Sequence, residues 1–399
     1  MKILLLGNGF DIFHKLPTKY QNFLHTVNFL KNKYDSSMNN VGDVFSNKMI
    51  LDKEIRESYD RYKKLYDKIP IDCEKINKLL SFSQNNMWYS YLNNSFNEDL
   101  KWIDFEIEIA KVLCEIGKFF DIHKGTNNKR VISIPLSDEF SKTRYIIQCF
   151  SFFNHECKKG ANINFYYRTV DPHYVIEEPY GSQIYDIDKE KIIDEMYKHL
   201  RELAEMIKLY LECFVESLTD LLKNDDTIVP GISVYDATHV VTLNYTNTYE
   251  KIYGDKNVFH IHGNTHNDIV LGINSDENDE LHKLNTDFIC FKKYYQRVFY
   301  KTDIDYQKFN ISINKFINSP YQKDDSVYVI GHSLDETDTE IIQNVFDRVN
   351  KIVIFYHKES AVKDYIRNLI KIYGKKGFDS LRAEKNLEFK SLSEIEVKK

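Results

Sequence analysis

The sequence predicts an α/β fold in which a parallel, Rossmann-type sheet domain is interrupted by a large, mainly helical insertion. Three observations lead to this fold class. Short, continuous apolar runs typical of buried parallel strands occur near both ends of the chain and hardly at all in the middle. Capped helical patterns lie between several of these runs. The middle of the chain carries apolar residues at helical spacing instead.

The expected strands are apolar runs of four to six residues that are bounded by turn signals. They cover residues 3–6, 239–243, 258–261, 269–273, 327–330 and 352–356, and one more strand is expected near 387–389. Capping boxes predict helix starts at Thr18, Asn247 and Thr337. A last helix is expected to begin at Ser360 and to end at Gly374.

Residues 31–235 form the predicted helical insertion. Apolar residues recur at i, i+3, i+4 and i+7 over residues 53–68, 98–120 and 188–223, whereas residues 131–171 fit no regular pattern. The expected organisation is one sheet domain made of residues 1–30 and 236–375, the insertion 31–235 between its two parts, and a charged C-terminal tail 376–399.

Composition narrows the class of protein. The chain has 399 residues, 42% of them hydrophobic, so it can bury a core and is not disordered as a whole. Its net charge of −6 argues against a general duplex-DNA binder. No run reaches the roughly 20 apolar residues of a membrane-spanning helix, and the first residues do not resemble a signal peptide, so a cytoplasmic protein is expected.

The six cysteines are expected to be reduced thiols within the core. They lie at positions 73, 114, 149, 157, 213 and 290, and no two of them form a C-x-x-C pair. This spacing excludes a zinc ribbon, and a disulfide framework is not expected in a long chain without a secretory signal.

Two strand ends carry glycine-containing turns that could approach a phosphate closely. The first turn is Gly7-Asn8-Gly9-Phe10-Asp11, and the second is Gly331-His332-Ser333. In both cases the alternative is an ordinary strand-to-helix turn, and the third glycine of a full dinucleotide fingerprint is missing from the first. Because ligands lie across the carboxyl ends of strands in open sheets, two such turns strengthen the nucleotide interpretation.

Polar residues follow two further strands. Thr242 and Asn244 stand at the end of one strand, where Asn244 either contacts a ligand or initiates a turn. His262 precedes Gly263 at the end of the next strand and could act as a general base near neutral pH. With His260 and His266 it could instead form a metal site, but no Cys or carboxylate ligand stands nearby at standard spacing, so no metal is expected.

These motifs, in this order, resemble the AbiH family of bacterial phage abortive-infection proteins. The N-terminal part of the resemblance is Gly7-Asn8-Gly9-Phe10-Asp11 followed by Leu16-Pro17-Thr18-x-Tyr20-x-x-Phe23. The later parts are Trp102-Ile-Asp104-Phe-Glu106, Leu243-Asn244-Tyr245-Thr246, Ile261-His262-Gly263 and Ile330-Gly331-His332-Ser333-Leu334-x-x-x-Asp338.

A remoter similarity connects the chain to sirtuins. It implies that Gly7 and Gly9 belong to the phosphate loop, that Asn244 lies near the nicotinamide ribose, and that His262 is the catalytic histidine. Gly331 and Ser333 would bind the phosphate and adenosine half of NAD+. Two departures matter: the chain lacks the cysteine pairs of the sirtuin zinc ribbon, which argues against a protein deacylase, and Thr246 stands where sirtuins carry an aspartate.

The resemblance therefore implies a cytoplasmic defence effector that hydrolyses NAD+, held inactive until a phage-derived trigger or an operon partner acts on it. His262 would be the general base, Asn244 would orient water or ribose, and Asp11 would contact a ribose hydroxyl or cap a helix. NAD+ is the expected substrate, a homo-oligomer is expected, and neither nucleic acid nor membrane is. The alternatives are a non-catalytic NAD or ADP-ribose binding module that switches a partner, and an interaction protein without a ligand.

Overall fold

The computed structural model of the chain divides into two units. The first unit comprises residues 1–80, 207–270 and 297–399, and the second comprises residues 81–206 and 271–296. The structure describes residues 1–35, 37–50, 52–96, 103–122, 134, 138–159, 166–177, 185–222, 237–254, 257–273, 286–317 and 325–394.

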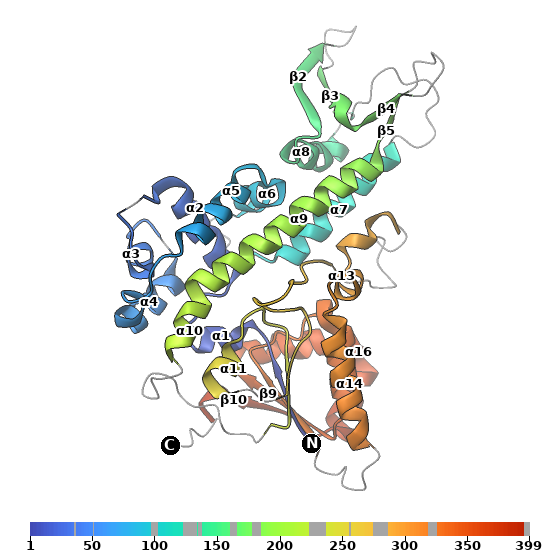
Figure 1. The fold of residues 1–399 in the computed structure, drawn as a ribbon. Coiled ribbons are helices and arrows are strands. Elements are labelled where there is room, and N and C mark those ends of the chain that lie inside the picture. The colour runs from blue at the N-terminus through green and yellow to red at the C-terminus, as the bar shows by residue number, and fades with distance from the viewer. Residues whose placement is uncertain are drawn as a thin grey trace. The chain divides into compact units, whose positions relative to one another are not determined.

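A six-stranded sheet forms the centre of the first unit (Figure 1). Among the described residues the spatial order is β10-β9-β8-β1-β6-β7, and every neighbouring pair is parallel. The strands are Lys2–Leu6 (β1), His239–Thr242 (β6), Val258–His260 (β7), Ser326–Ile330 (β8), Lys351–Tyr356 (β9) and Leu387–Ser391 (β10). The chain extends the sheet from β1 to β6 and β7, then returns to the other side of β1 with β8. The strand order therefore reverses beside β1.

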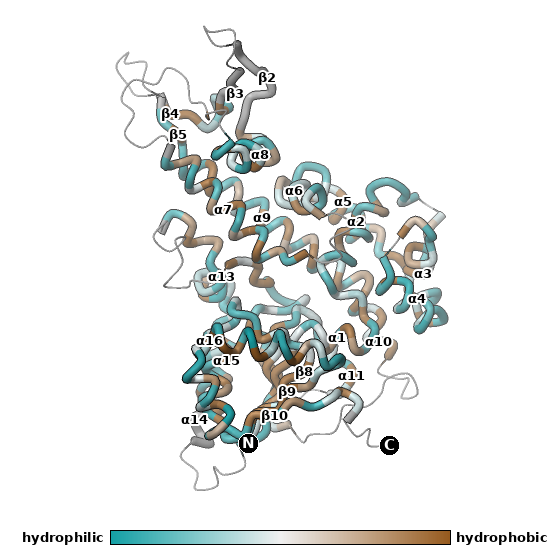
Figure 2. Tube along the Cα trace, turned by 180° about the vertical axis from the view of Figure 1, so that it is seen from behind, coloured by the Kyte–Doolittle hydropathy of each residue, from teal (hydrophilic) through white to brown (hydrophobic). Residues whose placement is uncertain are grey.

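The strands of this sheet are apolar on both faces, as strands of a parallel sheet must be when helices cover both sides. Ile3 and Leu5 of β1 join a core with helices α14, α15 and α16, whereas Leu4 and Leu6 face a core with α1 and α11. The brown strands of Figure 2 show this concentration of hydrophobic residues. The prediction of a parallel α/β sheet is confirmed.

The helices of the first unit follow β1 in the chain, and α1, α11, α14, α15 and α16 pack against the sheet. The helices of this unit are Asn8–Phe13 (α1), Tyr20–Lys33 (α2), Val41–Phe45 (α3), Lys53–Tyr66 (α4), Ser217–Leu222 (α10), Thr248–Tyr253 (α11), Asp303–Ile317 (α14), Thr339–Phe346 (α15) and Ser360–Glu384 (α16), with the π-turn Glu212–Glu216 (η4) and the 3₁₀ turns Glu336–Asp338 (η7) and Leu392–Glu394 (η8). Three helices contain a boundary between units in their sequence: Cys73–Asn85 (α5), Lys189–Leu211 (α9) and Lys293–Tyr300 (α13).

The second unit is mainly helical and also contains two β-hairpins. Its elements are Met87–Ser95 (α6), Phe105–Ile122 (α7), Asp138–Phe140 (η2), Ser141–Cys149 (α8), Phe153–Lys159 (β2), Tyr166–Val170 (β3), Pro172–Tyr174 (η3), Val175–Glu177 (β4), Tyr185–Ile187 (β5) and Thr286–Phe291 (η5). The side chain of Trp88 is fully buried, and its indole N–H donates to the carbonyl of Met196 at 2.8 Å. Helix α8 and strands β2 and β3 account for most of the stretch that fitted no sequence pattern.

One expected strand is absent from the sheet. Residues 269–273 are apolar, but the described segment is irregular and contributes one isolated bridge between Ile273 and Lys292. Its backbone groups have other partners: the N–H of Val270 donates to the carbonyl of His262, and both backbone groups of Leu271 bond to the Gln296 side-chain amide. The prediction of a strand is wrong because buried apolar loops satisfy the same sequence pattern.

Three predicted helix ends are displaced. Helix α2 begins after Lys19, whose N–H donates to Asn22 Oδ1 at 2.8 Å, so the cap lies one residue beyond Thr18. Before α15, Asp335 rather than Thr337 supplies the capping oxygen, at the start of η7. The last helix does break at Gly374, where φ is +69°, but α16 then continues to Glu384.

The predicted division at residues 30, 235 and 375 stays a prediction. Helices α3, α4 and α10 belong to the same unit as the sheet, although they lie within the segment 31–235. Five of the six cysteines, at positions 73, 114, 149, 213 and 290, are free thiols. Cys73 is exposed and the other four are partly exposed, in contrast to the buried positions expected for them.

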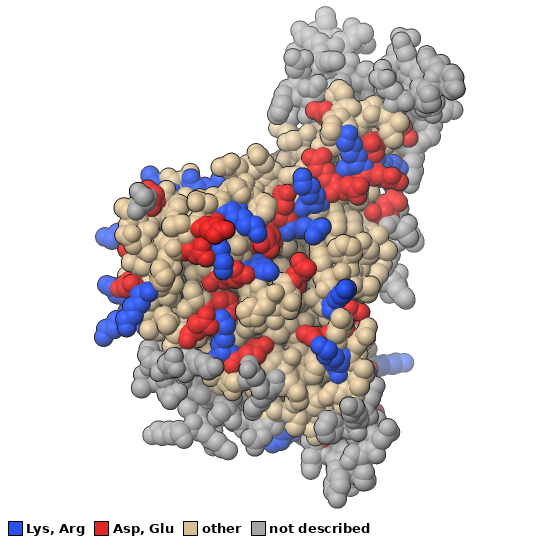
Figure 3. All heavy atoms as spheres, in the orientation of Figure 1, with Lys and Arg blue, Asp and Glu red and all other residues tan. Residues whose placement is uncertain are grey.

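The described surface carries both signs of charge. On the face shown in Figure 3, Lys and Arg side chains lie among Asp and Glu side chains and do not gather into a patch of one sign. In the part of the chain that the structure describes, no helix combines the length and the apolar character that crossing a bilayer requires.

Candidate functional site

The carboxyl ends of β1, β6, β7 and β8 meet at one edge of the parallel sheet, beside the place where the strand order reverses. Open sheets bind ligands at such a switch point. The residues that follow these strands are the candidates that the sequence singled out: Gly7–Asp11 after β1, Asn244 after β6, His262 after β7 and Gly331–Ser333 after β8.

The two glycine-containing turns pack backbone against backbone. The N–H of Gly7 donates to the carbonyl of Ile330 at 3.1 Å, and the N–H of Gly9 donates to the carbonyl of Gly331 at 2.8 Å. Gly331 has a φ of +71°, and a Cβ there would lie 2.1 Å from the amide nitrogen of Phe10. The glycines thus allow two loops to touch, and the amides of Gly7 and Gly9 are used within the fold.

Asn244 is tied to the first of these turns. Its side-chain amide donates to the carbonyl of Gly7 at 3.1 Å, and its own N–H donates to the hydroxyl of Thr242 at 3.1 Å. The Asn244 side chain is buried at the junction of β1 and β6. This contact fixes the end of β6 against the end of β1.

A carboxylate joins His262 to His332. His262 Nε2 lies 3.1 Å from Asp338 Oδ1, and His332 Nε2 lies 3.2 Å from Asp338 Oδ2. The Nδ1 atom of His332 accepts the N–H of Leu334 at 2.9 Å, so the proton of a neutral His332 is on Nε2 and is donated to Asp338. Both imidazoles are about 5% exposed.

Asp11 is fully buried beneath the same edge. The hydroxyl of Thr246 donates to its Oδ2 at 2.7 Å, and Thr248 in turn donates to Thr246 at 3.1 Å. Burial raises the pKa of the Asp11 carboxyl to about 7, against the opposing effect of these hydroxyls. Thr246 is therefore the direct hydrogen-bond partner of the buried Asp11 carboxyl.

Glu216, at the end of the π-turn η4, braces two of the loops. Its Oε1 accepts the N–H of Asn247 at 2.7 Å and the hydroxyl of Thr265 at 3.1 Å. Its carboxylate also forms an ion pair with Lys251 of α11. Asn247 lies three residues after Asn244, and Thr265 lies three residues after His262, so one buried carboxylate holds both candidate loops.

The other predicted site residues have different surroundings. The Phe10 side chain belongs to the apolar core between the sheet and α11. Asn8 and Ser333 are exposed, and the Asn8 side chain pairs with that of Thr18. Gly263 has a φ of +75°, and a Cβ there would lie 1.9 Å from the carbonyl oxygen of Asp268.

The two histidines at the end of β7, His260 and His262, do not share a ligand position. His260 Nε2 lies 2.5 Å from Glu250 Oε1, whereas His262 turns to Asp338. Within the described ranges, no group of three or more His, Cys, Asp or Glu side chains is arranged to hold a metal ion.

Two residues of this site were missed as functional candidates. Asp338 belongs to the motif after β8, and its spacing of six residues from His332 could have marked it as a partner for a histidine at the same edge. No local signal marks Glu216, because it lies on an amphipathic helical segment remote in sequence from every motif.

Comparison with known proteins gives one family match, over a range that contains all of the strand-end motifs described above. A protein-family model described as "Bacteriophage abortive infection AbiH" matches residues 3–357. No curated protein matches the chain significantly. No solved structure does either.

Proposed function

Because the chain belongs to the AbiH family of bacteriophage abortive infection proteins, we propose that it is a defence effector that hydrolyses NAD+ to nicotinamide and ADP-ribose. The single observation that carries this proposal is the pairing of His262 with Asp338 at the switch point of the sheet. A histidine held by a carboxylate is a common arrangement for a general base.

The sheet supports a dinucleotide as the ligand. Numbered along the chain, its strands run 3-2-1-4-5-6, which is the order of doubly wound dinucleotide-binding sheets. The loops after β1 and β8 meet at the reversal, where the diphosphate of a dinucleotide lies in such sheets. We assign the diphosphate and adenosine to these two loops, and to Gly7, Gly9 and Gly331 the close packing that brings the loops together.

The second carboxylate oxygen of Asp338 is used by His332, which keeps the carboxylate in place. With Nε2–H directed at Asp338, the neutral His262 has its lone pair on Nδ1, and Nδ1 is the atom that can take up a proton. The Asp338 carboxylate then stabilises the imidazolium that forms.

The reaction needs one water and no second reactant. The bond between the ribose C1′ and the nicotinamide nitrogen breaks, and its electron pair leaves with nicotinamide, which becomes neutral. The water oxygen forms the new bond to C1′, and its proton goes to His262. The centre at C1′ resembles an oxocarbenium ion, as in glycoside hydrolysis.

Asn244 has the role of a positioning residue in this proposal. Its bond to the Gly7 carbonyl places its side chain between the first phosphate-side loop and β6. From there it would orient the ribose or the attacking water. Thr242 and Gly263 shape the adjoining strand ends, and Asp11 supports the site from below through Thr246.

A non-catalytic NAD or ADP-ribose binding module is the second candidate. The observation that favours it is that the Asn244 side-chain amide donates to the Gly7 carbonyl, so this amide is used within the fold and not to orient a water. In that case the chain senses a nucleotide and switches a partner protein.

The test is NAD+ consumption by the purified full chain, with release of nicotinamide followed by chromatography, in the presence and absence of lysate from phage-infected cells. We expect turnover in at least one condition and its loss in His262→Ala. His266→Ala is the matched control, because His266 is an exposed histidine four residues away. Equal, non-zero rates for wild type and His262→Ala would contradict the assigned base. Tight NAD+ binding without turnover under either condition would favour the binding module.

A further inference from the structure

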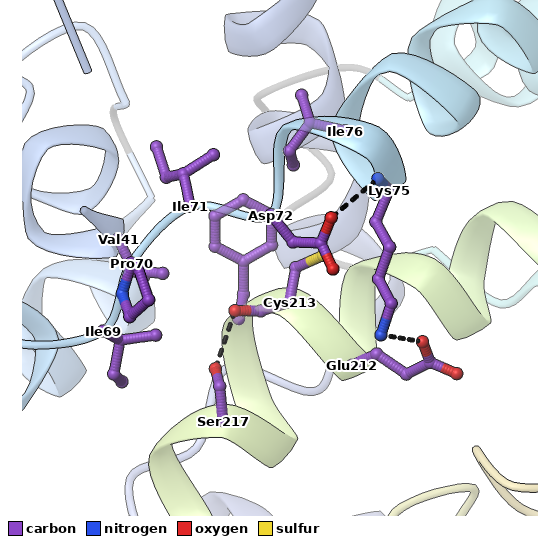
Figure 4. A pocket seen from close by; sticks show the side chains of 11 residues that line it. Val41, Ile69, Pro70, Ile71, Asp72, Lys75, Ile76, Glu212, Cys213 and Ser217 are labelled. Atoms are coloured by element: carbon purple, nitrogen blue, oxygen red, sulfur yellow. Dashed lines mark hydrogen bonds and ion pairs between the residues drawn. The ribbon is translucent and has the colours of Figure 1, made fainter. Parts of the chain in front are cut away.

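A pocket of about 270 Å³ lies within the first unit, beside the π-turn η4 (Figure 4). It is separate from the strand ends described above. Its lining comes from the start of α3, the chain before α5, the first turn of α5 and the segment 212–217. The aliphatic and aromatic part of the lining comprises Val41, Ile69, Pro70, Ile71, Ile76 and Phe214.

The opposite part of the pocket is charged. Asp72, Lys75 and Glu212 lie there, and the Lys75 ammonium is 2.7 Å from Glu212 Oε2. Glu212 raises the pKa of Lys75, and Asp72 contributes in the same direction. Burial raises the pKa of the Cys213 thiol to about 12, so that thiol is neutral. The charged lining thus has two carboxylates and one ammonium, an excess of one negative charge.

The π-turn η4 forms part of the pocket wall and also carries Glu216, which holds the two candidate loops. Cys213 and Phe214 face the pocket, and Glu216 follows two residues later. The Ser217 hydroxyl donates to the carbonyl of Cys213 at 2.7 Å, within the widened π geometry. Such single-turn π segments are frequent at functional sites, and a shift to α geometry turns the residues that follow.

We infer that this pocket binds a small organic cation with an apolar body, and that its occupancy is passed through Glu216 to the loops of Asn244 and His262. The ligand's ammonium group replaces that of Lys75 beside the Glu212 carboxylate, and its apolar body lies against the aliphatic wall. The Lys75 ammonium can move away from Glu212, because the side chain is about two-fifths exposed and its four-carbon stem is flexible.

The size of the pocket limits the ligand. At about 30 Å³ per water, its volume corresponds to roughly nine waters. An arylalkylamine of that size fills it, whereas an acid of the same shape would face two carboxylates. The same argument predicts that a neutral alcohol binds more weakly than the amine, since it forms no charge-assisted hydrogen bond.

Isothermal titration calorimetry on the full chain tests the binding with 2-phenylethylamine, 2-phenylethanol and phenylacetate. We expect the amine to bind at least ten times more tightly than the other two, and Glu212→Gln to weaken it about tenfold. Glu74→Gln is the matched control, because Glu74 is an exposed acid on α5 that does not line the pocket. Cys213→Met, which fills the wall, is expected to abolish binding. Equal binding of all three compounds, or none at millimolar concentration, would overturn the inference.

Hydrogen exchange tests whether pocket occupancy reaches the loops. This part of the inference rests on the proposed function only because the loops carry the proposed site residues Asn244 and His262. We expect 2-phenylethylamine to change exchange of residues 244–248 and 262–265 in the wild type. Glu216→Gln is expected to bind the amine with unchanged affinity and to lose the change in exchange. Binding without any change in the wild-type loops would refute the coupling. No turnover is measured, so a failure of NAD+ hydrolysis leaves both readouts intact.

Discussion

His262 Nε2 lies 3.1 Å from Asp338 Oδ1, although 76 residues separate the two in sequence. In the sheet, β8 lies on one side of β1, and β6 and β7 lie on the other. Because these strands are parallel, β7 and β8 end at the same edge, and the residues that follow them can meet there. His332 completes the arrangement on the other carboxylate oxygen. Because both histidines pair with the Asp338 carboxylate, removing its charge should change the tautomer and the charge of the imidazoles.

Asp338→Asn is expected to lower the proposed NAD+ hydrolysis about 100-fold or more. An amide cannot accept from both imidazoles, so one ring must take the other tautomer. The acid limb of the pH–rate profile should also move to lower pH, because the anion that favours the imidazolium is gone. Asp335→Asn is the control: Asp335 only caps η7. An unchanged profile in Asp338→Asn would show that this carboxylate does not act on His262.

Gly331→Ala should destabilise the first unit by about 2–5 kcal/mol. Its positive φ strains any side chain, and the new Cβ would meet the Phe10 amide nitrogen at 2.1 Å. Gly254→Ala separates the two causes, because Gly254 has a φ of +92° with nothing within 4 Å of a Cβ. We expect about 1 kcal/mol there, because its φ of +92° and ψ of 160° lie in a region that favours glycine. Urea unfolding followed by far-ultraviolet circular dichroism measures both, and equal costs would contradict the loop-contact argument.

Asp11→Asn should become more stable relative to the wild type as the pH rises from about 4 to 7. The folded-state pKa of Asp11 is about 7, against 3.8 for an ordinary Asp, so the folded chain holds a proton in this window that the unfolded chain has lost. Wild-type stability therefore falls across it. At about 1.4 kcal/mol per pKa unit, the relative gain is about 4 kcal/mol at most.

The measurement is the difference in unfolding free energy between Asp11→Asn and the wild type at each pH. The difference removes other titrating groups, His14 above all. Burial lowers the pKa of His14 to about 4, so its contribution has the opposite sign: stability is lost as the pH falls from 6.5 to 4. A difference that does not vary between pH 4 and 7 would show that Asp11 is ionised in the folded protein.

Glu216→Gln should lower the stability of the first unit by about 1–3 kcal/mol. The amide can still accept from Asn247, but the ion pair with Lys251 is lost in a buried setting. Asp220→Asn is the matched control, since Asp220 pairs with the same ammonium at 2.9 Å but is mostly exposed. We expect that control to change the unfolding free energy by less than about 0.5 kcal/mol. Similar effects for both would remove the case for Glu216 as a brace.

The sheet could be predicted from sequence because its strands satisfy one local rule. Runs such as residues 3–6 and 327–330 are apolar on both faces and end in turns. This pattern is typical of parallel strands that are buried on both faces. Residues 269–273 meet the same rule and still form a loop, since their hydrogen-bond partners are a distant carbonyl and the side chain of Gln296. The apolar pattern indicates which residues are buried, but it does not indicate which groups form hydrogen bonds with their backbone N–H and C=O groups.

The candidate site was predictable to the same extent. The histidine, asparagine and glycine positions follow strands, so the sequence places them at one edge. Asp338 and Glu216 act through pairings 76 and 31 residues long, which depend on strand order and on the π-turn. Neither has a local pattern from which the pairing could be read.

The central position of β1 also has a consequence for folding. Its two neighbours follow it by 236 and 324 residues (Ile3 opposite His239, Lys2 opposite Ser326). Contacts of such long sequence separation form late and slowly. Nascent chains shorter than about 340 residues have no Asp338 to hold His262, so the site cannot assemble until β8 and the segment that follows it have been synthesised.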